Sequence, residues 1–345
     1  MSYHFLMDLA LILLSTKILG LVAQKFQMPQ VVGALIAGLI LSPAGLGLLS
    51  ETEFTAQLSE LGVIVLMFSA GMGTDIKELK NSGKAGFMVA VLGVVVPFLM
   101  GTALAWGADE LGLIETTGFL ESVFTGTILT ATSVSITVET LKEMKKLETK
   151  VGNTILAAAL IDDVLGLVAL TLVCSLAGGD ESIGMVLLKI AGFFVFAFVV
   201  GFAANRVFCW MLKRQHGWAS HRNSVFAFVL CLVMAYCAEE FFGVADITGA
   251  YAAGLAVACT PKGTYIQTKY NPLGYLLLTP VFFASIGINV QITGLTGGML
   301  AFSLLLLLIS IISKLLGCGL GAKACHFSTV SYTHLRAHET TLHLV

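Results

Sequence analysis

Long apolar segments alternate with short polar segments along almost the whole chain. Each apolar segment approaches the 17–25 residues that a helix needs to cross a bilayer. Hydrophobic residues make up 57% of the 345 residues and charged residues only 12%. The pattern predicts an all-α polytopic membrane protein. Eleven spans are expected, roughly at residues 6–23, 30–49, 58–73, 84–107, 119–140, 150–175, 184–212, 223–241, 246–260, 271–287 and 297–323.

Basic residues predict how these spans are oriented, because cytoplasmic loops retain Lys and Arg. Fourteen basic residues lie in or beside the loops after odd-numbered spans: Lys25, Lys77, Lys80, Lys84, Lys142, Lys145, Lys146, Lys150, Arg206, Lys213, Arg214, Arg222, Lys262 and Lys269. The loops after even-numbered spans hold Lys189 alone. The N-terminus is therefore expected outside, with the loops after odd-numbered spans in the cytoplasm.

Two sequence motifs recur at one fixed offset. VVGALIAGL at 31–39 aligns with ITGAYAAGL at 247–255, and LMFSAGMGTDI at 66–76 aligns with FFASIGINVQI at 282–292. Both pairs are 216 residues apart. The paired spans cross in opposite directions, so the pattern predicts an inverted-topology repeat, which many secondary transporters use for alternating access. Similar-looking helix-packing faces rich in small residues are the alternative.

The end of the chain departs from this pattern. At the same offset, the partners of spans five and six begin near residue 335 and extend past 345, so two spans are expected to be missing. The final VSYTHLRAHETTLHLV is abruptly polar and resembles a translated sequencing adapter. We expect a C-terminally truncated transmembrane domain at 1–327 and a non-native tail at 328–345. His334 and His338 in that tail have a metal-pair spacing, but no metal site is predicted.

The most unusual residues are two adjacent acids, Asp162 and Asp163, inside the apolar segment AALIDDVLGLVAL. Ionisable groups at membrane depth cost about 3 kcal/mol each and usually face a cavity or an opposite charge. Successive helical residues point about 100° apart, so the two acids should have different partners. One of the two acids can pair with Lys314, while the other faces the cavity as an oxygen ligand for a small cation. The alternative is a purely structural ion pair.

The fifth span contains a stretch of poor helix formers, GTILTATSVSITVET at 126–140. Its β-branched and hydroxyl residues weaken the helix and can satisfy an unwound backbone. The pattern predicts a discontinuous crossing helix beside span six. Thr130, Thr132 and Ser133 are the candidate second ligands, through side chains or carbonyl groups. Ordinary hydrogen bonding between helices is the alternative role for these residues.

Four segments together carry a family resemblance: TATSVSIT, AALIDDVLGLVAL, SKLLGCGLGA and MPQVVGALIAGLILSPAGLGLL. They resemble the bacterial sodium/proton antiporters of the monovalent cation/proton antiporter superfamily, in its electrogenic two-aspartate branch. The resemblance implies thirteen helices, of which about eleven are present, and a homodimer in the plasma membrane. It also implies that Asp163 is the essential ion-binding acid, that Asp162 pairs with Lys314, and that Thr132 and Ser133 lie near the ion.

The expected function is exchange of Na⁺, and of Li⁺ as a further candidate, for protons by alternating access. Asp163 can hold a proton or help bind the cation, and exchange needs no covalent chemistry, so neither an enzyme activity nor a cofactor is expected. If Asp163 and the Asp162–Lys314 pair both titrate, two protons enter for each sodium ion that leaves. Partners are then the transported ions and the bilayer, with no nucleic acid.

Three other functions remain open at this stage. A potassium/proton antiporter or potassium efflux system shares the architecture, although the efflux systems typically carry glutamine at the first aspartate position and a nucleotide-binding domain. A sodium-coupled organic-anion symporter has a similar repeat. An intramembrane aspartyl protease also uses two acids but needs a GxGD motif, and GMGTD at 71–75 has threonine in place of the acid.

The charged segment ETLKEMKKLETK at 139–150 has two interpretations. It is expected to be a solvated connecting helix in which Glu and Lys side chains form weak pairs. A pH-sensing cytoplasmic surface is the alternative.

Overall fold

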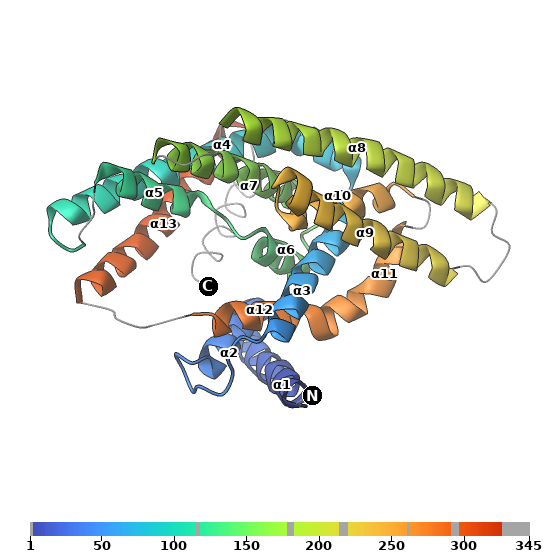
Figure 1. Ribbon diagram of the computed structural model, residues 1–345, viewed down its shortest axis with the longest axis horizontal. Coiled ribbons are helices and arrows are strands. Elements are labelled where there is room, and N and C mark those ends of the chain that lie inside the picture. Colours follow the sequence, from blue (N-terminus) through green and yellow to red (C-terminus); the bar gives the residue numbers. More distant parts are fainter. Residues whose placement is uncertain are drawn as a thin grey trace. The chain divides into compact units, whose positions relative to one another are not determined.

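The computed structural model describes residues 3–114, 118–177, 183–213, 220–260, 263–290 and 297–325. Every regular element in these ranges is a helix (Figure 1). The helices are α1 (His4–Lys25), α2 (Gln30–Leu41), α3 (Glu53–Met72), α4 (Ile76–Glu110), α5 (Phe119–Thr130), α6 (Val134–Glu143), α7 (Lys150–Leu176), α8 (Ile183–Lys213), α9 (Ser220–Phe242), α10 (Asp246–Ala258), α11 (Gly263–Leu273), the π-helix η1 (Gly274–Leu278), α12 (Thr279–Ile288) and α13 (Gly297–Ala324). The predicted tail at 328–345 and the domain boundary before it lie outside the described residues.

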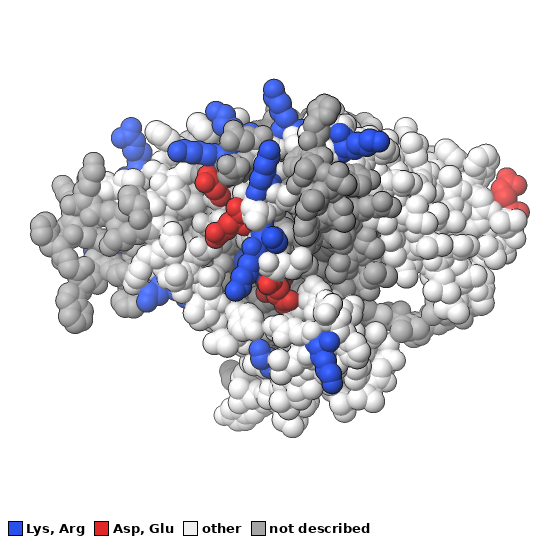
Figure 2. Space-filling view, turned by 180° about the vertical axis from the view of Figure 1, so that it is seen from behind, with Lys and Arg blue, Asp and Glu red and all other residues white. Residues whose placement is uncertain are grey.

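The all-α membrane architecture is confirmed. Nine helical segments in the described part of the chain are long and apolar enough to cross a membrane. The space-filling view shows broad areas with neither acidic nor basic residues (Figure 2), as expected for a surface in contact with lipid. Helices occur in all eleven predicted spans, but α2 and α10 have only 12 and 13 residues.

The second predicted span is shorter than expected because its helix ends at Leu41. Ser42 adopts an extended conformation with ψ 165°, which suits a residue that precedes proline. Pro43, Gly45 and Gly47 then continue the chain outside regular structure, and Gly47 has a positive φ of 65°. The apolar residues at 44–49 therefore lengthened the predicted helix without belonging to it.

The chain divides into two compact units. Unit 1 comprises residues 1–76, 138–145 and 192–293, and unit 2 comprises residues 77–137, 146–191 and 294–345. In unit 1, α2 packs between α1 and α12, and α10 packs between α9 and α3. In unit 2, α4 lies against α5 at Gly101, against α7 at Gly86 and against α13 at Gly93.

Close glycine contacts in unit 1 follow the predicted repeat. A Cβ added to Gly38 on α2 would overlap the backbone of Ala284 on α12, and one added to Gly254 on α10 would overlap Phe68 on α3. Gly38 and Gly254 are 216 residues apart. Helix α2 therefore crosses α12, and its repeat equivalent α10 crosses α3, which is the repeat equivalent of α12. The two aligned motifs are thus structurally equivalent.

We expect Gly38→Ala and Gly254→Ala to destabilise the protein to a similar extent, by about 1–3 kcal/mol, because each methyl group must displace a helix backbone. Gly107→Ala on α4 is the matched control, since no atom outside its own helix lies within 4 Å of an added Cβ. Thermal unfolding in detergent measures all three variants. Loss of stability in only one of the two crossings would contradict their equivalence.

The interpretation of residues 139–150 as a solvated connecting helix is wrong for the first residues of this segment, 139–143. Glu139 and Glu143 belong to α6, and Glu139 is only 8% exposed. Both carboxylate oxygens of Glu143 accept from the backbone N–H of Gln30, at 3.0 and 2.8 Å. This carboxylate therefore satisfies a free donor at the N-terminus of α2. The crossing helix continues into this segment, which places its polar residues against α2.

Candidate functional site

The candidate site lies in unit 2 at a break between two short helices. Helix α5 ends at Thr130, Ala131 is extended with ψ 133°, and α6 begins at Val134. The predicted discontinuity of the fifth span is therefore confirmed. At this point the last carbonyl groups of α5 and the first N–H groups of α6 have no partners within their own helices.

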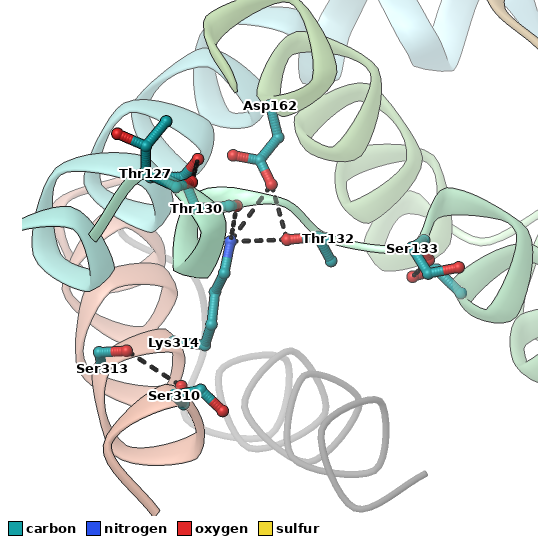
Figure 3. Close-up of polar contacts among 9 residues, drawn as sticks. Thr127, Thr130, Thr132, Ser133, Asp162, Ser310, Ser313 and Lys314 are labelled. Atoms are coloured by element: carbon teal, nitrogen blue, oxygen red, sulfur yellow. Dashed lines mark hydrogen bonds and ion pairs between the residues drawn. The ribbon is translucent and has the colours of Figure 1, made fainter. Parts of the chain in front are cut away.

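Side chains within the break cap the helices themselves. The Thr130 hydroxyl donates to the carbonyl of Thr127 at 2.7 Å, and Thr137 donates to the carbonyl of Ser133 at 2.9 Å. Ser133 Oγ accepts from the N–H of Ile136 at 3.4 Å. In the close-up, Ser133 lies apart from the group around Lys314 (Figure 3). The side chains of Thr130 and Ser133 are thus engaged in local structure.

Lys314 reaches this break from α13, and its ammonium group has three acceptors (Figure 3). Nζ donates to the carbonyl of Thr130 at 2.7 Å, to Thr132 Oγ1 at 2.6 Å and to Asp162 Oδ2 at 3.3 Å. Lys314 is 1% exposed and Asp162 is 7% exposed. The predicted pairing of Lys314 with Asp162 is therefore present in the structure. The lysine also places a positive charge at the negative C-terminal end of α5.

Thr132 connects the two charged residues. Its hydroxyl accepts from Lys314, so the hydroxyl proton is available for Asp162 Oδ2, which it reaches at 2.7 Å. Oδ2 of Asp162 thus accepts one hydrogen bond from Lys314 and a second from the hydroxyl of Thr132, which itself accepts from Lys314. The other carboxylate oxygen, Oδ1, is buried and receives no hydrogen bond from the described residues. A cavity of about 10 Å³, room for a single water molecule, lies beside Asp162, Thr132, Thr137 and Lys314.

Asp163 has a different environment from its neighbour. Its side chain is partly exposed, and its buried Oδ2 receives no hydrogen bond from the part of the chain that the structure describes. The two acids therefore differ as expected from their 100° separation on α7. Asp162 is fixed by Lys314 and Thr132, whereas Oδ2 of Asp163 has no hydrogen-bond partner in the described ranges.

Two features of this site escaped the sequence analysis. The carbonyl of Thr130, not its side chain, contacts Lys314, and Thr137 lines the small cavity. The contact of Lys314 with the Thr130 carbonyl could have been inferred from a buried lysine and a broken helix in one membrane domain. The free C-terminus of a helix attracts a cation. No group of three or more His, Cys, Asp or Glu side chains in the described ranges could hold a metal ion.

Comparison with known proteins places this chain in a family. The profile of the sodium/hydrogen exchanger transmembrane family matches residues 10–336. The chain is 36% identical over 333 residues to the Na(+)/H(+)-K(+) antiporter GerN of Bacillus cereus, covering 96% of this chain and 83% of that protein. It is 35% identical over 333 residues to a Na(+)/H(+) antiporter of Enterococcus hirae, covering 95% of this chain and 84% of that protein.

A solved structure has the same fold. The sodium proton antiporter MjNhaP1 of Methanocaldococcus jannaschii superposes with a TM-score of 0.72 at 19% identity, covering 97% of this chain and 81% of that chain. At this identity the likeness concerns the fold alone. Together with the family profile and the two bacterial relatives, it identifies the chain as a member of the sodium/hydrogen exchanger family.

Proposed function

We propose that the protein exchanges monovalent cations for protons across the membrane by alternating access, with Asp163 as the shared cation and proton site. The observation that carries this proposal is the carboxylate of Asp163, which has no hydrogen-bond partner among the described residues and lies beside a fixed Asp162–Lys314 pair. Family membership supports the ion class. Relatives at 35–38% identity are named as sodium/proton antiporters.

Competition at one carboxylate couples the two ions. Asp163 can bind a proton or contribute oxygen ligands to a cation, but it cannot do both at once, so loading one ion releases the other. Thr132 and Ser133 are proposed to lie near the ion, with the backbone at Thr130 held by Lys314. Exposure of this site to the two sides in turn then gives antiport.

The Asp162–Lys314 pair is proposed as a second titrating unit. If this pair and Asp163 each take up a proton per cycle, two protons enter for every sodium ion that leaves. One net charge then moves inward, and each 100 mV of membrane potential contributes about 2.3 kcal/mol to cation extrusion. Because the groups interact strongly, they titrate as a set.

The proposed location is the plasma membrane, with the N-terminus outside and the loops after odd-numbered spans in the cytoplasm. The distribution of basic residues supports this orientation. A homodimer is proposed from the family resemblance.

Proteoliposomes that contain a pH-sensitive dye test the exchange function directly. With an imposed inward-acid gradient, addition of Na⁺ or Li⁺ is expected to dequench the dye in a concentration-dependent manner, and empty liposomes provide the control. Dequenching that is absent with every monovalent cation would contradict the proposal.

Potassium/proton antiport is the second candidate, because one relative is named as a Na(+)/H(+)-K(+) antiporter. The same assay with K⁺ separates the two, since a potassium-selective protein responds to K⁺ at concentrations where Na⁺ has no effect. Sodium-dependent uptake of a labelled organic anion would instead indicate a sodium-coupled organic-anion symporter.

A further inference from the structure

Unit 1 contains a second cavity, whose lining does not include the aspartate pair. Its volume is about 280 Å³, close to the lower limit for small-molecule sites in proteins, and α1, α2, α6, η1 and α12 all contribute to its wall. Lys17 and Tyr275 are exposed at its rim, whereas Thr16, Glu139 and Thr279 are buried within it. The wall of the cavity therefore includes both exposed and buried side chains.

The rim of this cavity is fixed by contacts between distant parts of the chain. Lys17 Nζ donates to Tyr275 Oη at 3.2 Å and lies 5.2 Å from the centre of the Tyr275 ring. Tyr275 is part of the π-helix, in which the N–H of Thr279 donates to the carbonyl of Gly274, five residues earlier. Pro272 and Pro280, which lack N–H donors, flank this element and favour the irregular turn. The π-helix thus positions Tyr275 at the rim of the cavity.

Two carboxylates one helical turn apart project into the cavity from α6. Glu143 is anchored by the N–H of Gln30. Glu139 is only 8% exposed and forms no hydrogen bond or ion pair with any residue that the structure describes. Lys142 on the same helix attracts it electrostatically without direct contact. An ionised carboxylate buried without hydrogen-bond donors is costly, so Glu139 has unused capacity to accept from a cation.

The remaining wall of the cavity is mostly apolar. Leu13, Val31, Leu276 and Phe283 line it, together with Ala34 and Pro280. A bare metal ion prefers a shell of oxygen ligands, which this wall does not offer. A group with several N–H donors and an attached hydrocarbon chain matches both the two carboxylates and the apolar surface.

We propose that this cavity binds a primary ammonium group carried on an apolar chain, with the ammonium between Glu139 and Glu143 and the chain against Leu13, Val31 and Phe283. The site shares no residue with the cation/proton site at Asp163, and the proposal does not depend on the transport function. Either a soluble alkylamine or an ethanolamine phospholipid can supply this chemistry.

Binding of hexylammonium to the purified protein at pH 7, where an alkylamine is charged, tests the proposal by calorimetry. Saturable binding is expected for hexylammonium. Hexanol and hexanoate, which lack the cation, and tetramethylammonium, which lacks N–H donors, are expected not to compete with it. Equal affinity for hexylammonium and hexanol would overturn the proposal, because binding would then reflect apolar partition alone.

Variants locate the site. Glu139→Gln is expected to raise the dissociation constant of hexylammonium about tenfold, the usual effect of losing a charged hydrogen bond. Glu240→Gln, which removes an exposed acid from α9, is the matched control and should bind as wild type. Ala34→Leu keeps both carboxylates but fills the apolar wall, so it should also weaken binding.

Asp163→Asn separates this site from the transport site, because it should bind hexylammonium with wild-type affinity while losing ion exchange. Wild-type affinity in Glu139→Gln, or loss of binding in Asp163→Asn, would overturn the proposal. Nanodiscs distinguish the two sources of the ligand. Weaker hexylammonium binding in phosphatidylethanolamine than in phosphatidylcholine identifies the lipid as the occupant, and equal binding identifies a soluble amine.

Discussion

Asp163→Asn is expected to abolish cation/proton exchange while leaving the protein folded. An amide cannot carry the proton and is a poorer ligand for a cation than a carboxylate. The structural cost should be small, because the side chains have nearly the same size and Asp163 Oδ2 receives no hydrogen bond from the described residues that an amide would lose. Proteoliposomes with an internal pH dye measure exchange, and the melting temperature in detergent measures folding.

Glu110→Gln provides the matched control for this variant. Glu110 is an exposed acid at the end of α4, in the same unit as Asp163, so the control makes the same change of charge outside the site. It should transport at the wild-type rate. Substantial sodium-dependent dequenching by Asp163→Asn would rule out the shared-site mechanism.

Lys314→Ala is expected to destabilise the protein more than the double change Asp162→Asn with Lys314→Gln. The single change leaves the buried Asp162 without its cation, a loss of about 3–5 kcal/mol when one member of a buried pair is removed. It also leaves the carbonyl of Thr130 without the donor that now reaches it at 2.7 Å. The double change removes both charges and retains an amide donor. Melting temperatures in detergent compare the two.

Transport by the double variant tests the second part of the same proposal. If the Asp162–Lys314 pair is a titrating unit, the double variant should exchange ions but depend less on an imposed membrane potential than wild type. Equal stability of the single and double variants would mean that the two residues are not energetically paired. A wild-type response to potential would exclude the pair from charge movement.

The fold was largely predictable because length and polarity alone select membrane-crossing helices. The fixed offset between VVGALIAGL and ITGAYAAGL also predicted which helices are repeat equivalents, and Gly38 and Gly254 occupy matching positions in them. The ends of helices were less predictable. Hydropathy does not register that Pro43 disfavours the helical conformation of the preceding residue, and it cannot reveal the π-helix at Gly274–Leu278, which is flanked by Pro272 and Pro280.

The charged residues of the candidate site were predictable, because burying an ionisable side chain in a membrane costs free energy. Pairing of Lys314 with one of the two adjacent aspartates could be predicted from sequence because each charge would be unfavourable alone, and the family resemblance assigned that role to Asp162. The relay through Thr132 was not predictable, because threonine is common in membrane helices and only its position at the break brings it between two charges. Glu139 was misjudged for a related reason. Its charged neighbours in sequence suggested a solvated surface, yet its helix turns it into a cavity.

The three hydrogen bonds donated by Lys314 can form only late in the synthesis of the chain. Asp162 and Lys314 are 152 residues apart, and a ribosome adds about 5–20 residues per second. For roughly 8–30 s the nascent chain therefore holds a broken helix and an acid in the membrane without their cation. Helices α5 to α7 can be inserted during this interval, but their polar centre is completed only when α13 arrives. A chain released before residue 314 would present this centre to the proteases that remove incomplete membrane proteins.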